Sequence, residues 1–194
     1  MLNGNELFKS LHAEAVNLGD PCANFITFTT VDAAGKPHSR TLTVRSVKDS
    51  QIVVGVNSDS PKMHELKSNH KWELSGFWPV RMVQFRIRGS VVSSRPDSLR
   101  EGWKKKNTHS RLADIYQAEV REQSSILENR AQLLSEISTL AETANLDAIP
   151  ESLIALEFSP NFYEIWIGSE VDRLPDRTVH RLIDGNWKTE VLVP

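Results

Sequence analysis

The chain has 194 residues, of which 25% are charged and 39% hydrophobic, and its formal net charge is −2 at pH 7. These are ordinary values for a globular protein, and the slight acidic balance gives no global reason to expect nucleic-acid binding. Cys22 is the only cysteine, which excludes an intrachain disulfide and argues against a cysteine-based metal site.

No targeting or membrane segment is visible in the sequence. The N-terminus lacks a basic region followed by an apolar one, and no apolar run approaches membrane-spanning length. The histidines have no paired ligand spacing, since His64 and His70 are poorly placed for chelation, so we expect no metal. We therefore expect a cytoplasmic protein with no membrane partner, folded as one domain over residues 1–194.

The first half of the chain is predicted to form one helix followed by closely spaced strands. Residues 5–18 place apolar side chains at helical spacing, and Gly19, Asp20 and Pro21 end the helix. Strand patterns follow at 23–31, 39–45, 51–56, 71–77 and 81–93, with a turn at 34–37 and a short helix before residue 71.

The middle of the chain changes character. Residues 96–144 contain no strand-like run, and apolar residues recur there at helical intervals, which predicts two or three helices. Strands return at 153–158, 162–167, 178–183 and 187–193. About nine strands without a β-α-β rhythm predict a mainly β fold with helices (α+β), an antiparallel barrel with a helical insert at about 96–145.

A candidate phosphate site lies between a strand and the short helix. Asn57 ends the strand, Ser60 is a good N-cap, and Pro61 is a good first helical residue. A helix that begins here presents backbone N–H groups and the positive end of its dipole, and Lys62 adds a full charge. The alternative is an ordinary capped helix without a ligand.

The strand at 39–45 carries two arginines. Strand alternation places Leu42 on the face of Arg40, and Thr41 and Thr43 on the face of Arg45. The ends and the twist of a strand can still bring both arginines to one ligand. The alternative is a solvated strand edge.

Two further segments carry amide side chains. Gln84 lies on the polar face of the strand at 81–93, where an amide offers both a donor and an acceptor. The alternative for this strand is a half-solvated one with a basic face. Gln123 and Ser124 fall between two predicted helices and by themselves mark only a helix boundary.

Three consecutive lysines at 104–106 follow Trp103. Basic residues beside an aromatic one suggest a nucleic-acid patch, but the acidic balance elsewhere favours a solvated helix face. We therefore expect no nucleic-acid partner.

The C-terminal segment combines an aromatic residue with two cations. Trp166 ends a predicted strand, and Arg173 and Arg177 follow it with Pro175 between them. An aromatic face beside fixed cations suits a flat, electron-rich or anionic ligand.

These segments, in this order, resemble those of the pyridoxamine 5'-phosphate oxidase family, flavoproteins that carry FMN on a split β-barrel. The resemblance runs from about Arg40 to Pro194 and rests on the helix start, the Gln84 strand, the Gln-Ser pair and the C-terminal arginines. Two positions depart from the family pattern. Pro61 stands where an arginine is expected, and Pro175 stands where a histidine is expected.

The resemblance implies that the chain binds FMN. Arg40 and the backbone that follows it would contact FMN, and Ser60 and Lys62 would grip its phosphate. Gln123 and Ser124 would reach that phosphate from the partner subunit, which implies a homodimer with two shared sites. The implied cofactor residues are Arg40, Thr41, Leu42, Thr43, Asn57, Ser60, Lys62, Gln84, Gln123, Ser124, Trp166 and Arg177.

The resemblance also implies a substrate, pyridoxamine or pyridoxine 5'-phosphate or a similar phosphorylated B6 vitamer. Arg45 and Arg111 would bind it, and Arg173, the implied catalytic residue, would hold it over the flavin ring. A hydride would pass from the substrate C4' carbon to flavin N5, with oxygen as the final acceptor. Two alternatives stay open: an FMN-dependent oxidoreductase acting on another substrate with a nicotinamide donor, and a non-catalytic flavin-binding protein.

Overall fold

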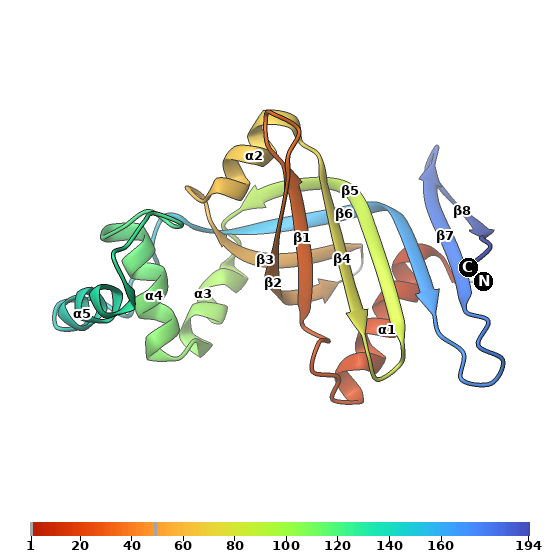
Figure 1. The fold of residues 1–194 in the computed structure, drawn as a ribbon, viewed down its shortest axis with the longest axis horizontal. Helices are drawn as coiled ribbons and strands as arrows, with labels where there is room; N and C mark the ends of the chain where they lie inside the picture. The colour runs from red at the N-terminus through yellow and green to blue at the C-terminus, as the bar shows by residue number, and fades with distance from the viewer. Residues whose placement is uncertain (1, 49) are drawn as a thin grey trace.

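The computed structural model describes residues 2–48 and 50–194. Its centre is a closed antiparallel barrel of six strands in the order β3-β2-β1-β4-β5-β6, which pairing between β6 and β3 closes (Figure 1). The barrel strands are β1 (Phe25–Val31), β2 (Pro37–Lys48), β3 (Gln51–Asn57), β4 (Trp72–Trp78), β5 (Val83–Ser94) and β6 (Leu153–Ile167). The predicted antiparallel α+β split barrel is therefore confirmed.

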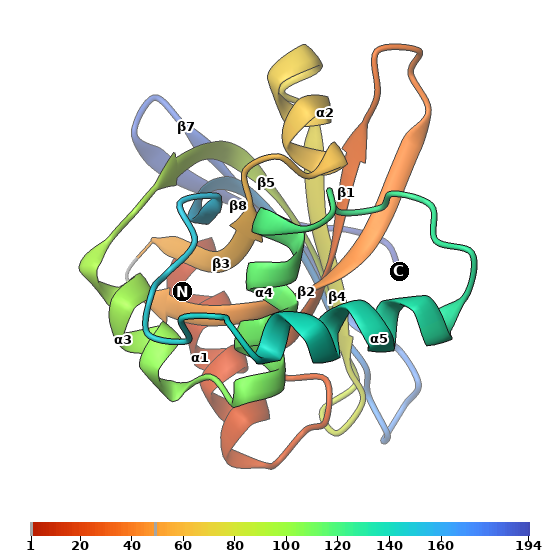
Figure 2. The ribbon, with the colours of Figure 1, turned by 90° about the vertical axis from the view of Figure 1, so that its left-hand side faces the viewer.

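Five helices and two further strands surround the barrel. The helices are α1 (Gly4–Asn17), α2 (Pro61–Asn69), α3 (Asp97–Lys105), α4 (Thr108–Glu119) and α5 (Arg130–Ala141). The last three confirm the helical insert and lie together on one side of the barrel, as Figure 2 shows. Strands β7 (Asp176–Ile183) and β8 (Asn186–Val191) extend the sheet on the opposite side, at the right of Figure 1. No helix in the described part of the chain is long and apolar enough to cross a membrane.

The barrel core follows from strand alternation. One inward-facing residue from each of five strands is fully buried, namely Phe28, Val54, Leu74, Ile87 and Phe158. Helix α1 begins at a capping box formed by Asn3 and Glu6. Its Phe8 then packs against the rings of Trp78, Phe85 and Tyr163. These contacts hold α1 against the barrel.

One element differs from the sequence prediction. The segments 153–158 and 162–167 were expected to be separate strands, but β6 is continuous from Leu153 to Ile167. Its first half pairs with β3 up to Phe158, and its second half pairs with β7 from Phe162 onward. Pro160 lies where the partner changes, so its missing N–H interrupts no ladder with β3 or β7. The described residues therefore form eight strands rather than nine.

The close pairing of β5 with β6 depends on Gly89. A bulge lies between Arg88 and Gly89, and a Cβ on Gly89 would lie 2.2 Å from the carbonyl oxygen of Ser159 and 2.7 Å from Cα of Pro160. Both are backbone atoms, so a side chain there forces the two strands apart. We expect Gly89→Ala to lower the free energy of unfolding by about 2 kcal/mol or more, as overpacking does.

Denaturant unfolding checks this expectation against Gly102→Ala. A Cβ on Gly102 meets nothing within 4 Å, and the residue lies in α3, where alanine is the better helix former. Gly102→Ala should therefore be neutral or slightly stabilising. Equal stability of Gly89→Ala and the unmodified chain would show that the pairing of β5 with β6 does not require glycine at this position.

Candidate functional site

The start of α2 leaves its first backbone N–H groups without a side-chain cap. Ser60 is the N-cap and Pro61 the first helical residue, as the sequence predicted. The Ser60 hydroxyl donates to the Asn57 carbonyl at 2.6 Å instead of accepting from the helix. The Asn57 side chain in turn accepts from Asp59 N and donates to the carbonyl of Gln117 on α4. The loop is thus fixed, while the positive end of the helix dipole stays available to an anion.

Lys62 is a buried cation with no acidic partner at its ammonium group. The residue is 7% exposed, and its Nζ donates to Oε1 of Gln123 at 3.2 Å. Burial, and next the positive charge of Arg40, lower the pKa of Lys62 to about 8, against a smaller opposing effect of Glu65. Among the described residues no carboxylate forms an ion pair with Lys62. An anion bound here would supply the missing charge.

A cavity of about 200 Å³ lies at this position. It is enclosed by β2, β3, the start of β6, α2, α4 and the segments next to these elements. Its lining residues are Leu42, Arg45, Gly55, Val56, Asn57, Lys62, Lys106, Asp114, Gln117, Gln123, Ser152 and Leu153. The cavity therefore brings together predicted site residues from three separate segments of the sequence.

Arg45 reaches the cavity because β2 is irregular there. Strict alternation would place Arg45 on the outer face with Thr43, but the pairing of β2 with β3 shifts register between Val44 and Ser46. A bulge of this kind re-aims a side chain. Arg45 thus lines the same cavity as Leu42, whereas Thr41 and Thr43 pair with β1 on the outer face and do not line it.

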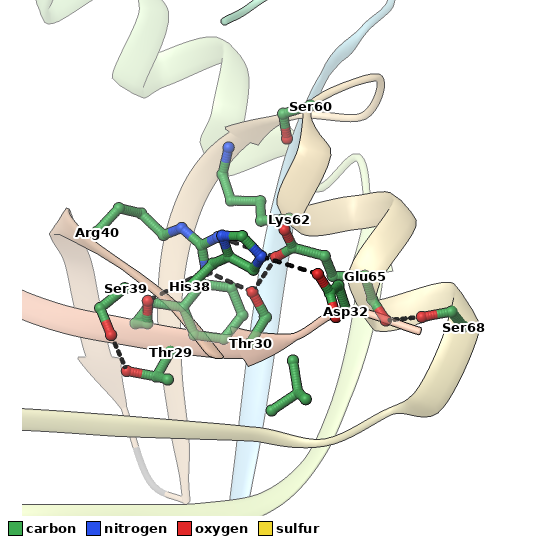
Figure 3. A network of polar contacts seen from close by, with 12 residues as sticks. Thr29, Thr30, Asp32, His38, Ser39, Arg40, Ser60, Lys62, Glu65 and Ser68 are labelled. Carbon is green, nitrogen blue, oxygen red and sulfur yellow. Dashed lines mark hydrogen bonds and ion pairs between the residues drawn. The ribbon is translucent and has the colours of Figure 1, made fainter. Parts of the chain in front are cut away.

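Arg40 lies next to this cavity and is already neutralised. Figure 3 shows its guanidinium meeting Glu65 and Thr30 under α2, with NH2 2.9 Å from Oε2 of Glu65 and NH1 2.5 Å from Oγ1 of Thr30. Burial would raise the pKa of Glu65, but the hydrogen bonds from Thr30 and Arg40 outweigh it and lower that pKa. The alternative of a solvated strand edge is wrong for Arg40, whose side chain is 24% exposed.

Lys106 is a cavity residue that the sequence analysis missed. It was expected to lie on a solvated helix face, yet its side chain is only 17% exposed. Its Nζ forms an ion pair with the Asp114 carboxylate and lies 5.5 Å from the centre of the Trp103 ring. The sequence carries one signal for this contact. Trp103 and Lys106 are one helical turn apart, a spacing that allows their side chains to pack together.

Arg111 does not reach the cavity. Its guanidinium donates to the backbone carbonyls of Lys104 at 2.8 Å, Lys106 at 3.1 Å and Leu146 at 3.3 Å. These bonds tie α3 and the loop after α5 to α4. Three of its five N–H donors are therefore used by backbone acceptors, and the predicted substrate contact of Arg111 stays a prediction.

Gln123 and Ser124 lie in an irregular segment that α5 fixes. Ser124 has a positive φ of 73°, and Gln123 contacts Lys62 within the same chain, so no partner subunit is needed to bring Gln123 there. Arg121, two residues before Gln123, donates Nε and NH2 to the two Glu136 oxygens, each at 2.8 Å. The hydroxyl of Tyr116 donates to the same carboxylate at 2.6 Å. The hydrogen bond from Arg121 and then that from Tyr116 lower the pKa of Glu136 to about 2.

A second group of predicted residues forms one row on the outer face of the sheet. Gln84 on β5 lies opposite Trp166 on β6, and Trp166 lies opposite Arg177 on β7. Arg177 donates NH2 to Oε1 of Glu164 at 2.8 Å. A shallow hollow of about 400 Å³ adjoins Gln84 over β1, β4 and β5. None of the three residues of this row lines the first cavity.

Arg173 lies in the loop between β6 and β7. It has a positive φ of 58° and is exposed. The neighbouring Asp172 accepts from Leu174 N at 3.0 Å, which holds the turn. Within one chain, neither Arg173 nor Arg177 lines the cavity at α2.

Comparison with known proteins agrees with this fold. The family described as pyridoxamine 5'-phosphate oxidase matches residues 14–143. The pyridoxine/pyridoxamine 5'-phosphate oxidase of Pseudomonas putida (strain W619) is 31% identical over 192 residues, covering 97% of this chain and 87% of the relative. That of Acinetobacter baumannii (strain SDF) is 30% identical over 186 residues, covering 94% and 83%.

Two solved structures share the fold. PhzG from Burkholderia lata 383, in complex with tetrahydrophenazine-1-carboxylic acid, superposes with a TM-score of 0.82 at 22% identity, covering 99% of this chain and 93% of that chain. A pyridoxamine 5'-phosphate oxidase-related, FMN-binding protein from Nostoc punctiforme PCC 73102 superposes with a TM-score of 0.74 at 17% identity, covering 100% of both chains. At these identities the likeness is one of fold.

Proposed function

Because the chain belongs to the pyridoxamine 5'-phosphate oxidase family, we propose that it is an FMN-dependent oxidase acting on a small anionic substrate. The observation that carries the proposal is the buried Lys62 at the start of α2, which has no acidic partner at its ammonium group among the described residues. A phosphate monoester supplies the charge and the acceptor oxygens that such a site requires.

The residues present fit the phosphate of FMN. Lys62 offers an ammonium group, Gln123 an amide, and the start of α2 the positive end of its dipole. Pro61 brings neither a charge nor an N–H, so this chain would hold the phosphate with fewer contacts than the family pattern implies. Arg40 would add no free charge to the site, since Glu65 already binds its guanidinium.

The row of Gln84, Trp166 and Arg177 fits the flavin ring. The Gln84 amide would meet the polar ring edge, Trp166 would exclude water, and the guanidinium of Arg177, which Glu164 fixes, would lie beside the ring. Because this row does not line the cavity at α2, we propose that a second copy of the chain completes each site. A homodimer would then hold two equivalent sites, each with residues from both chains.

The proposed chemistry divides between cofactor and protein. FMN would supply the hydride-accepting chemistry, with oxygen as the final acceptor. Arg45, at the mouth of the cavity, would bind the substrate anion, and the exposed Arg173 would hold the substrate from its loop. Pro175 cannot donate the hydrogen bond that a histidine would supply, which leaves substrate binding to the arginines.

Two substrate classes follow from the comparisons. The curated relatives are named for pyridoxine and pyridoxamine 5'-phosphate, whereas the PhzG structure holds a carboxylic acid of a partly reduced ring. A phosphorylated B6 vitamer is the first candidate. A ring carboxylic acid is the second, because the forked donor of Arg45 suits a carboxylate as well as a phosphate.

The test is the visible spectrum of the FMN-loaded protein under anaerobic conditions. Loss of the flavin band on adding pyridoxamine 5'-phosphate, and its return with oxygen, would establish an oxidase for that substrate. If only a nicotinamide donor bleaches the band, the protein would instead be an FMN-dependent oxidoreductase that acts on another substrate. A band that persists with pyridoxamine 5'-phosphate, reduced-ring carboxylates and nicotinamide donors would leave a flavin-binding protein and contradict the proposed oxidase.

Glu136 is expected to act on FMN binding through the segment that holds Gln123. Glu136→Gln removes the charge that fixes Arg121, so Gln123 loses its position beside Lys62. We expect an FMN dissociation constant about 10-fold higher, the effect of one weakened contact. Fluorescence titration with FMN measures this constant. Glu142→Gln, at the exposed end of α5, is the matched control and should bind as the unmodified chain does.

A further inference from the structure

Glu65 connects helix α2 to the neighbouring strands β1 and β2. It lies three residues after Lys62, so both side chains leave the same side of the helix. Its Oε2 accepts from NH2 of Arg40 at 2.9 Å and from the hydroxyl of Thr30. That hydroxyl in turn accepts from NH1 of Arg40 at 2.5 Å. Figure 3 shows these three side chains in contact beside Lys62, so the helix that carries Lys62 also holds Arg40.

This network is largely shielded from water. The exposed fraction of the side chain is 11% for Glu65 and 24% for Arg40, and Thr30 is fully buried. Thr30 carries no charge, and Glu65 is the carboxylate that forms an ion pair with Arg40 in the described part of the chain. Charges in such a place are weakly screened, so the loss of one charge is felt by its neighbours.

The two charges of this pair act on Lys62 in opposite directions. Burial lowers the pKa of Lys62 most, the positive charge of Arg40 lowers it further, and the negative charge of Glu65 raises it. Gln123, which accepts from the Lys62 ammonium group at 3.2 Å, has no charge with which to replace that of Glu65. Without the Glu65 charge, the repulsion from Arg40 is unopposed, and Lys62 loses its proton at a lower pH.

Further charged groups from neighbouring elements surround the network. They belong to β2, α4 and the segments that adjoin β1, α2 and α3, and they are Asp32, His38, Arg45, Asp59, Lys106 and Asp114. His38 pairs with Asp32, and Lys106 pairs with Asp114. A substitution at Glu65 replaces none of these groups, so a comparison of variants at one pH reports on the Glu65 charge.

We infer that Glu65 is a positioning residue of the anion site, because its ion pair with Arg40 preserves the charge of Lys62 for the ligand. Neither Glu65 nor Arg40 lines the cavity, so neither needs to touch a bound phosphate to affect its affinity. The inference rests on the proposed function, since it takes the FMN phosphate as the ligand of Lys62.

Fluorescence titration of the apoprotein with FMN at pH 7, 8 and 9 tests the inference in Glu65→Gln. Glutamine keeps the length of the side chain and can still accept from Arg40, but the charge is lost. Loss of a negative charge near the site favours an anion at every pH, so the diagnostic quantity is the affinity of the variant relative to the unmodified protein. We expect this ratio to fall about 5-fold between pH 7 and pH 9, the effect of lowering by one pKa unit a group that titrates near pH 8.

Two further variants separate charge from structure. Thr30→Val removes a hydroxyl but no charge, so its affinity relative to the unmodified protein should be the same at each pH, even where its stability is lower. Arg40→Gln/Glu65→Gln removes both charges of the pair and should restore the pH dependence of the unmodified protein.

Glu190→Gln is the matched control. Glu190 also pairs with an arginine, Arg181, but it lies on β8 and does not line the cavity, so this variant should bind FMN as the unmodified protein does.

A relative affinity of Glu65→Gln that stays constant from pH 7 to pH 9 would overturn the inference, because a purely structural role changes the affinity equally at each pH. A double variant that keeps the pH-dependent loss would also overturn it, since Glu65 would then not act through Arg40. Failure of the unmodified protein to bind FMN at any pH would instead contradict the proposed function, so the two failures are distinguishable.

Discussion

Lys62→Met is expected to weaken FMN binding by about 100-fold, the range for losing a charge-assisted hydrogen bond. The reason is the burial of Lys62 in the first turn of α2, where no described carboxylate pairs with its ammonium group. Methionine keeps the length and the apolar stem of the side chain, so the fold should persist. Fluorescence titration of the apoprotein with FMN measures the change.

Two controls separate charge from structure. Lys67→Met removes an exposed lysine from the last turn of the same helix and should leave FMN affinity unchanged. Lys62→Arg keeps the charge and should retain most of the affinity. An affinity of Lys62→Met equal to that of Lys67→Met would remove Lys62 from the cofactor site.

Because the pKa of Lys62 is lowered, both FMN affinity and the stability of the apoprotein should depend on pH. The folded value of this pKa, about 8, lies below the ordinary 10.5, so the apoprotein loses this charge as the pH rises through 8. FMN affinity of the unmodified protein should therefore fall above pH 8, and that of Lys62→Arg should not. Between pH 8 and 10.5 the unfolded chain binds more protons at this residue, so its contribution to the stability of the apoprotein rises with pH.

Arg173→Ala is expected to lower turnover by about 100-fold while FMN stays bound, because a charged contact to substrate is lost. Arg173 lies on an exposed loop and makes no described hydrogen bond with its guanidinium, so its removal should not disturb the sheet. Turnover is measured with whichever substrate bleaches the flavin anaerobically, and bound FMN is measured from the visible spectrum of the same sample.

Arg181→Ala is the control for this prediction. Arg181 lies on β7 and pairs with Glu190, away from the row of Gln84, Trp166 and Arg177. Its replacement should leave both turnover and flavin content unchanged. Full activity of Arg173→Ala would exclude Arg173 from the substrate site and leave Arg45 as the proposed anion ligand.

Much of the fold could be predicted from local patterns. Strand alternation and the absence of a β-α-β rhythm indicated the antiparallel barrel, and Ser60-Pro61 indicated the start of α2. The exception was β6, since residues 153–158 and 162–167 were expected to form two separate strands. The strand continues because β6 pairs with β5 along its length, while the partner on its other edge changes from β3 to β7 near Pro160. These are long-range contacts, which the sequence of one strand does not reveal.

The candidate site was less predictable because it depends on long-range contacts. Nothing near Arg40 in the sequence indicated that Glu65, on another element, would neutralise it. The bulge that turns Arg45 into the cavity contradicts simple alternation. Lys106 was expected on a solvated helix face, but its contacts with Trp103 and Asp114 hold it in the cavity. Arg111 was assigned by resemblance, and the sequence did not indicate that backbone carbonyls would take three of its five N–H donors.

The most direct test compares the affinities of the apoprotein for FMN and for riboflavin, which differ only in the phosphate. Our account places that phosphate at Lys62, Gln123 and the first turn of α2. It predicts that FMN binds about 100-fold more tightly than riboflavin, and that Lys62→Met removes most of the difference. Equal affinity for the two flavins, or no binding of either, would contradict the central claim that this cavity is an FMN phosphate site.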